Sequence, residues 1–142
     1  MSILMAFSCT PAGFGKAHAP LHLEQAPRYR VQINTPKGGF SGILILRLAE
    51  NEWRGSLVNE FGFKAFDLAS TPRRCELRNV MPFMNKWYIR MTLRDDFAYL
   101  LWKGNEGIPV SGKRIDRMPN GAFTLTNTKR HIEYIFQPLP RP

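Results

Sequence analysis

The stretch Met81–Trp102, MPFMNKWYIRMTLRDDFAYLLW, decides the fold, because the segments before and after it must cover its apolar side chains. Pro82 suits a first helical turn, where its missing N–H costs nothing. Lys103 and Gly104 suit a last turn with a left-handed cap. A helix that is apolar on more than one side has to be surrounded by other elements. The stretch therefore predicts a helix from about residue 82 to 103, wrapped by strands.

The apolar side chains of this helix form two offset faces rather than one stripe. The first face ends where its continuation meets Asp95. Its members are Met84, Trp87, Tyr88 and Met91. The second face consists of Phe97, Leu100 and Leu101. We therefore expect a joint near Arg94–Asp96, where Asp95 or Asp96 caps a second short helix.

Segments on both sides of the helix alternate between apolar and polar residues, as half-buried strands do. Tyr29, Val31 and Ile33, for example, alternate with polar neighbours. The expected strands cover residues 28–34, 40–48, 53–59, 61–68, 74–80, 108–118, 123–126 and 132–136. The segment 40–48 is apolar on both faces and predicts a central strand covered on both sides, whereas 74–80 predicts an edge strand. The fold expected is mainly β with a helical insert (α+β), a curled antiparallel sheet or half-barrel around the helix.

The beginning of the chain predicts an anchor and a tether. An apolar run ends in Ser8 and Cys9, as a truncated bacterial lipoprotein signal would, so we expect lipidation at Cys9. Residues 10–27 contain three prolines and no strand or helix period, which predicts a tether to a single domain over residues 28–142. The location expected is the cell envelope, on the periplasmic side of the outer membrane. An ordinary N-terminus with a chance cysteine is the alternative.

The composition is strongly basic, with 20 Lys and Arg against 11 Asp and Glu and a net charge of +9. Such a charge favours an anionic membrane surface, an acidic protein or a nucleic acid as partner, or serves solubility. An export signal argues against nucleic acid, which we do not expect. The basic residues fall into an earlier and a later group. The earlier group is Arg73, Arg74, Arg78, Lys86, Arg90 and Arg94, and the later is Lys113, Arg114, Arg117, Lys129 and Arg130.

No pattern in the sequence predicts a reaction, a cofactor or a metal site. Cys75 and His131 are a nucleophile and a base by type, but they lie on separate expected strands without an oxyanion turn. Cys75 is therefore interpreted as a small core residue. His18 and His22 are separated by Pro20, so helical ligand spacing does not apply to them. We expect a protein that is not an enzyme.

The aromatic and methionine residues allow two interpretations, a solid core or a cavity for a flexible apolar ligand. The strand residues concerned are Phe40, Leu44, Leu46, Trp53, Leu57, Phe61 and Phe63. The helix residues facing them are Phe83, Met84, Trp87, Tyr88 and Met91. Periodicity alone leaves both interpretations open.

The chain resembles the LolA/LolB-like group of bacterial lipoprotein-handling proteins and related uncharacterised outer-membrane lipoproteins. The resemblance is carried by MAFSC at residues 5–9, by FSGILILRLAENEWRGSLVNEFGFKAFDL at 40–68 and by the helix MPFMNKWYIRMTL at 81–93. It implies a half-barrel whose cavity binds lipid or lipoprotein acyl chains without catalysis. The lining residues that it implies are Leu44, Leu46, Trp53, Leu57, Phe63, Trp87 and Met91. A structural interaction module with a solid core and a basic nucleic-acid-binding domain are the alternatives.

Overall fold

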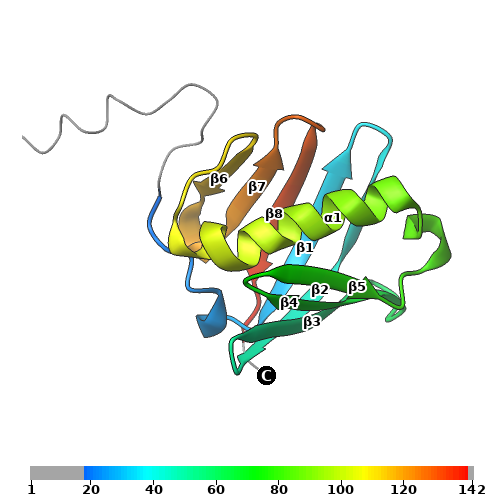
Figure 1. Ribbon diagram of the computed structural model, residues 1–142, viewed down its shortest axis with the longest axis horizontal. Coiled ribbons are helices and arrows are strands. Elements are labelled where there is room, and N and C mark those ends of the chain that lie inside the picture. Colours follow the sequence, from blue (N-terminus) through cyan, green and yellow to red (C-terminus); the bar gives the residue numbers. More distant parts are fainter. Residues whose placement is uncertain (1–17, 141–142) are drawn as a thin grey trace, which may run out of the picture.

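Eight antiparallel strands form one open, curled sheet, and a single long helix lies across it in the computed structural model, which describes residues 18–140 (Figure 1). The strands of the first half are β1 (Arg28–Thr35), β2 (Gly38–Ala49), β3 (Glu52–Asn59), β4 (Lys64–Thr71) and β5 (Arg74–Arg78). The helix α1 (Trp87–Tyr99) follows, and β6 (Lys113–Arg117), β7 (Phe123–Asn127) and β8 (Ile132–Pro138) complete the sheet. The expected fold class, a mainly β protein with a helical insert, is confirmed.

The sheet order is β5-β4-β3-β2-β1-β8-β7-β6. It consists of one meander, β1 to β5, and a second meander, β6 to β8, and the two are joined because β1 pairs with β8. β1 pairs with β2 on one side and with β8 on the other, with Val31 opposite both Gly42 and Phe136. β5 and β6 are consequently the two edges. The helix connects these edges, so it has to cross the whole curled sheet (Figure 1). This topology brings residues from distant parts of the chain to the two sides of the helix.

Each strand places one set of side chains under the helix. In β1, Tyr29, Val31 and Ile33 are buried, as the alternation predicts. In β2, Leu44 and Leu46 are buried, whereas Ile45 on the other face is exposed. The expectation that 40–48 is covered on both faces is therefore wrong, because the one long helix within residues 18–140 covers one face only.

The helix is continuous through the expected joint. A 3-10 turn, η3 (Pro82–Met84), precedes α1, and a π-helical turn, η4 (Leu100–Gly104), extends it. The joint expected near Arg94–Asp96 is wrong, because Asp96 does not cap a helix. Its carboxylate binds side chains of β6, β7 and β8 instead, which stabilises an acidic residue on the buried face.

The last part of the expected tether packs against the domain. Leu23 is buried in the short turn η2 (Leu23–Gln25), and its N–H donates to Asn105 Oδ1 at 3.0 Å. The N–H of Leu21 donates to the Asn105 carbonyl at 2.9 Å. The folded part of the domain therefore starts before Arg28. Cys9 and its expected lipidation lie outside the described residues.

Candidate functional site

The seven residues expected to line a cavity separate into two sets. Leu44, Leu46, Trp53 and Leu57 are buried in one core cluster with the helix residues. Trp53 Nε1 donates to the Leu101 carbonyl at 3.1 Å, which fixes the indole against the end of the helix. The other three side chains are exposed, with exposed fractions of 66% for Phe63, 74% for Trp87 and 39% for Met91. The expectation that these three face an interior is wrong.

Two local features explain why Phe63, Trp87 and Met91 point outward. Asn59 Oδ1 accepts hydrogen bonds from the N–H groups of Phe61 and Phe63, which holds this segment as a turn rather than a strand. A register shift between Leu57 and Val58 then sets the inward residues of β4. On the helix, the buried side is the second of the two faces read in the sequence, so Trp87 and Met91 point outward. The buried helix residues are Thr92, Leu93, Asp96, Phe97 and Tyr99.

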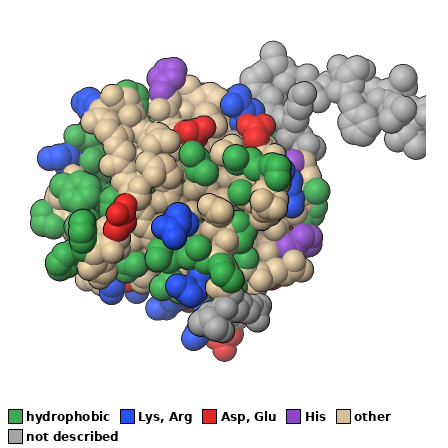
Figure 2. Space-filling model, turned by 180° about the vertical axis from the view of Figure 1, so that it is seen from behind, with side chains coloured by type: hydrophobic (Ala, Val, Ile, Leu, Met, Phe, Trp, Pro, Cys, Tyr) green, Lys and Arg blue, Asp and Glu red, His purple; other side chains and the backbone are tan. Residues whose placement is uncertain are grey.

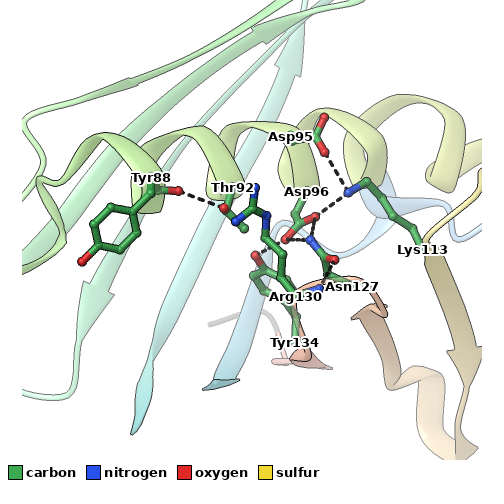
Figure 3. A network of polar contacts seen from close by, with 8 residues as sticks. All are labelled: Tyr88, Thr92, Asp95, Asp96, Lys113, Asn127, Arg130 and Tyr134. Carbon is green, nitrogen blue, oxygen red and sulfur yellow. Dashed lines mark hydrogen bonds and ion pairs between the residues drawn. The ribbon is translucent and has the colours of Figure 1, made fainter. Parts of the chain in front are cut away.

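A buried polar network centres on Asp96 (Figure 3). Lys113 Nζ donates to Asp96 Oδ1 at 2.7 Å and to Asp95 Oδ2 at 2.9 Å. Asn127 Nδ2 donates to Asp96 Oδ1 at 3.0 Å, and the Tyr134 hydroxyl donates to Asp96 Oδ2 at 2.5 Å. The network joins α1 to β6, β7 and β8. Every partner of the buried carboxylate is a donor, so the charge of Asp96 is compensated within the protein.

The pKa values of Tyr134 and Lys113 within the network are raised. Burial raises the pKa of Tyr134 well above its ordinary value, and the charge of Asp96 raises it further. Burial lowers the pKa of Lys113, but the hydrogen bonds and charges of Asp96 and Asp95 outweigh burial and raise it above 10.5. Burial, assisted by Glu24, also raises the pKa of Tyr29 to about 12. These groups thus keep their protons in the folded protein to higher pH than in an unfolded chain.

Stability is therefore expected to decrease at alkaline pH. Above roughly pH 10 the unfolded chain loses protons that the folded protein keeps, so the free energy of unfolding falls as the pH rises. The contribution is complete below that pH and is lost as the pH passes the raised folded-state values, at about 1.4 kcal/mol per pH unit for each such group. Urea unfolding of the protein and of Tyr134→Phe would measure this. For Tyr134→Phe, the free energy of unfolding should fall less steeply with pH. A stability of the unchanged protein that stays constant above roughly pH 10 would contradict the raised pKa values.

An apolar groove opens beside the start of α1, with a volume of about 570 Å³. Ligand pockets in proteins span roughly 300–1,000 Å³. The groove lies between the helix, the β1–β2 turn and the first residues of β8. Its apolar walls are Ile33, Phe40, Phe83, Met84, Tyr88, Ile89, Leu93, Ile132 and Tyr134. Phe40, Phe83, Met84 and Tyr88 belong to the aromatic and methionine set of the sequence, whereas none of the seven lining residues implied by the resemblance borders this groove. The walls come from β1, β2, η3, α1 and β8, which only the sheet topology brings together.

A second hollow, the cationic cleft, runs along the outer side of α1 between the edge strands β5 and β6. Its volume is about 660 Å³. Met91 is the one member of the expected lining set that borders it. Its walls combine cations and the carboxylate of Asp95 with the apolar parts of Pro72, Ala98, Tyr99, Trp102 and Val110. The cations are Arg73, Arg74, Arg94, Lys103, Lys113 and Arg130. The cleft thus joins the earlier and the later basic groups of the sequence.

Cys75 also lines the cationic cleft, on the edge strand β5. Burial raises the pKa of its thiol, and the hydrogen bond with Ser70 and the charge of Arg94 only partly offset that effect. The thiolate is the reactive form of a cysteine, and a raised pKa lowers the fraction of thiolate at neutral pH. His131 lies in the β7–β8 turn.

Among residues 18–140, no group of three or more His, Cys, Asp or Glu side chains is placed to hold a metal ion. In the same part of the chain, no helix combines the length and apolar character needed to cross a membrane. Comparisons with models of known protein families, with curated proteins and with solved structures found no match to this chain.

Proposed function

We propose that the protein is a non-catalytic lipid-binding protein of the cell envelope, which holds an acyl chain of a lipid or lipoprotein in the apolar groove. The observation that carries the proposal is the groove itself, an open hollow walled by aliphatic and aromatic side chains beside the helix. An acyl chain gains about 0.8 kcal/mol for each methylene that it buries. The groove borders the buried core and shares Ile33, Met84, Leu93 and Tyr134 with it, whereas the core residues Leu44 and Leu57 do not line the groove.

The surroundings of the groove support a membrane as the source of the ligand. Hydrophobic side chains gather along the edge of the molecule at which α1 begins (Figure 2). Exposed aromatic residues in this region of the chain are Phe61, Phe63, Phe83, Trp87 and Tyr88. The Met81 N–H donates to the Ala65 carbonyl at 2.8 Å, which places the β3–β4 turn near η3. Exposed aromatic patches of this kind mark surfaces that contact membranes or other proteins.

Cations accompany these aromatic residues. Lys37 lines the groove at the β1–β2 turn, and Lys86 and Arg90 lie at the start of the helix. Each lysine or arginine close to an anionic bilayer contributes about 1 kcal/mol to association. An anionic membrane surface is therefore the partner that we propose for this end of the molecule.

Titration of the protein with laurate by isothermal calorimetry tests the groove. Ile89→Trp fills the groove from the helix side, and we expect it to weaken binding more than about tenfold, the effect of excluding two methylenes. Ile45→Trp is the matched control, because Ile45 is exposed on the opposite face of the sheet. It should bind laurate as the unchanged protein does.

Thermal unfolding of both variants checks that each retains its fold. Absence of laurate binding by the unchanged protein, or equal binding by Ile89→Trp, would contradict the proposal. In the first case, the exposed aromatic end would become the candidate docking surface of an interaction module.

A further inference from the structure

The apolar groove and the cationic cleft meet at two residues, Thr92 and Arg130, which line both. From this junction we propose that the bound lipid is an amphipathic anion whose acyl chain lies in the groove and whose carboxylate or phosphate head lies in the cationic cleft, against Arg130. The proposal rests on the proposed function, since it assumes a chain in the groove. It adds the chemical class of the head group and the residues that recognise it.

The cations of the cleft are mostly uncompensated. Lys113 is paired with Asp95 and Asp96, and Arg74 is paired with Glu76 at 2.9 Å. The remaining four form no ion pair with an acidic side chain among residues 18–140. These four are Arg73, Arg94, Lys103 and Arg130. An anion entering the cleft would therefore meet an excess of positive charge, which attracts it.

Arg130 lies where the acyl chain of such a ligand would end and its anionic head group would begin. Figure 3 shows its side chain beside Thr92 of α1, between Tyr88 on the groove side and the Asp95–Lys113 pair on the cleft side. The nearest buried carboxylate, Asp96, already accepts from Lys113, Asn127 and Tyr134. The Arg130 guanidinium makes no hydrogen bond within residues 18–140, so its donors are available to an oxyanion. A guanidinium binds carboxylates and phosphates through two parallel hydrogen bonds.

The walls of the cleft suit a head group that is joined to an apolar chain. Tyr99, Trp102 and Val110 provide apolar surface next to the cations. Trp102 Nε1 already donates to Ser70 Oγ at 3.0 Å, so the indole presents its ring rather than a polar atom. Electrostatic attraction is stronger beside such low-dielectric walls than on an open surface.

The test compares three ligands of equal chain length: laurate, dodecyl phosphate and the uncharged dodecanol. We expect at least one of the two anions to bind more than about tenfold tighter than dodecanol, the effect of one charge-assisted hydrogen bond. The tighter of the two identifies the head as carboxylate or phosphate. The preference should decrease as salt is added, because the cleft is open to solvent.

Arg130→Gln should bind the preferred anion and dodecanol with similar affinities. Lys129→Gln is the matched control, because Lys129 is exposed in the same turn, carries the same charge and does not line the cleft. It should retain the preference. Thermal unfolding of both variants should give midpoints close to that of the unchanged protein, because Arg130 and Lys129 are exposed.

Equal affinity of the unchanged protein for all three ligands, or a full preference in Arg130→Gln, would overturn the head-group assignment and leave the acyl groove in place. Absence of binding for all three ligands would instead overturn the proposed function. The two failures are therefore distinguishable in one set of titrations.

Discussion

Asp96→Ala is expected to lower the free energy of unfolding by about 3–5 kcal/mol, because it leaves a buried lysine without its main partner. Lys113 is paired with Asp96 on one side and with the exposed Asp95 on the other. Removing Asp96 also leaves the Tyr134 hydroxyl and the Asn127 amide without an acceptor. Chemical unfolding measured by fluorescence of the three tryptophans gives the value.

Asp95→Ala is the matched control, since Asp95 contacts the same ammonium from a largely exposed position. Exposed ion pairs contribute roughly 0–1 kcal/mol, so this variant should be close to the unchanged protein. Lys113→Met should partly restore the stability of Asp96→Ala, because the unpaired charge is then absent. A loss for Asp96→Ala no larger than that for Asp95→Ala would show that the network does not hold the helix to the sheet.

Trp53→Ala is expected to cost about 3–5 kcal/mol, the usual range for truncating a buried aromatic side chain. Trp53 is buried in β3, and its Nε1 donates to the carbonyl of Leu101 where the helix becomes π-helical. Trp53→Phe should cost about 1–3 kcal/mol, because that carbonyl then lacks its donor. The thermal unfolding midpoint and urea titrations measure both variants.

Trp87→Ala provides a control of identical chemistry, because the Trp87 side chain is largely in solvent. Surface substitutions of this kind change stability by about 0.5 kcal/mol or less. Similar losses for Trp53→Ala and Trp87→Ala would contradict the assignment of one indole to the core and the other to the surface.

The fold could be predicted from the sequence where one local signal was sufficient. Alternation placed Tyr29, Val31 and Ile33 under the helix, and the polar residues around Leu77 identified β5 as an edge. The joint is predicted because the first apolar face meets Asp95 and because Asp96 also suits a cap when the partners of its buried carboxylate are not visible. Those partners are Lys113, Asn127 and Tyr134, which follow 17 to 38 positions later in the chain.

The site was less accessible to sequence reasoning, because its walls come from separate elements. The apolar groove combines Ile33 of β1 and Ile132 of β8 with Ile89 and Leu93 of α1. The aromatic and methionine set of the sequence contains Phe40, Phe83, Met84 and Tyr88 of these walls, but not the i, i+4 pair Ile89 and Leu93. The two basic groups were visible separately, and the path of the helix from β5 to β6 unites them in one cleft.

Methyl NMR of the protein during titration with laurate tests the central claim, an acyl chain in the apolar groove, most directly. We expect saturable shifts in the methyl groups of Ile33, Ile89 and Ile132, which line the groove, while those of Leu44 and Leu57, which do not line it, remain unchanged. Shifts confined to Leu44 and Leu57, or no shifts in any of these methyl groups at high laurate concentration, would contradict it.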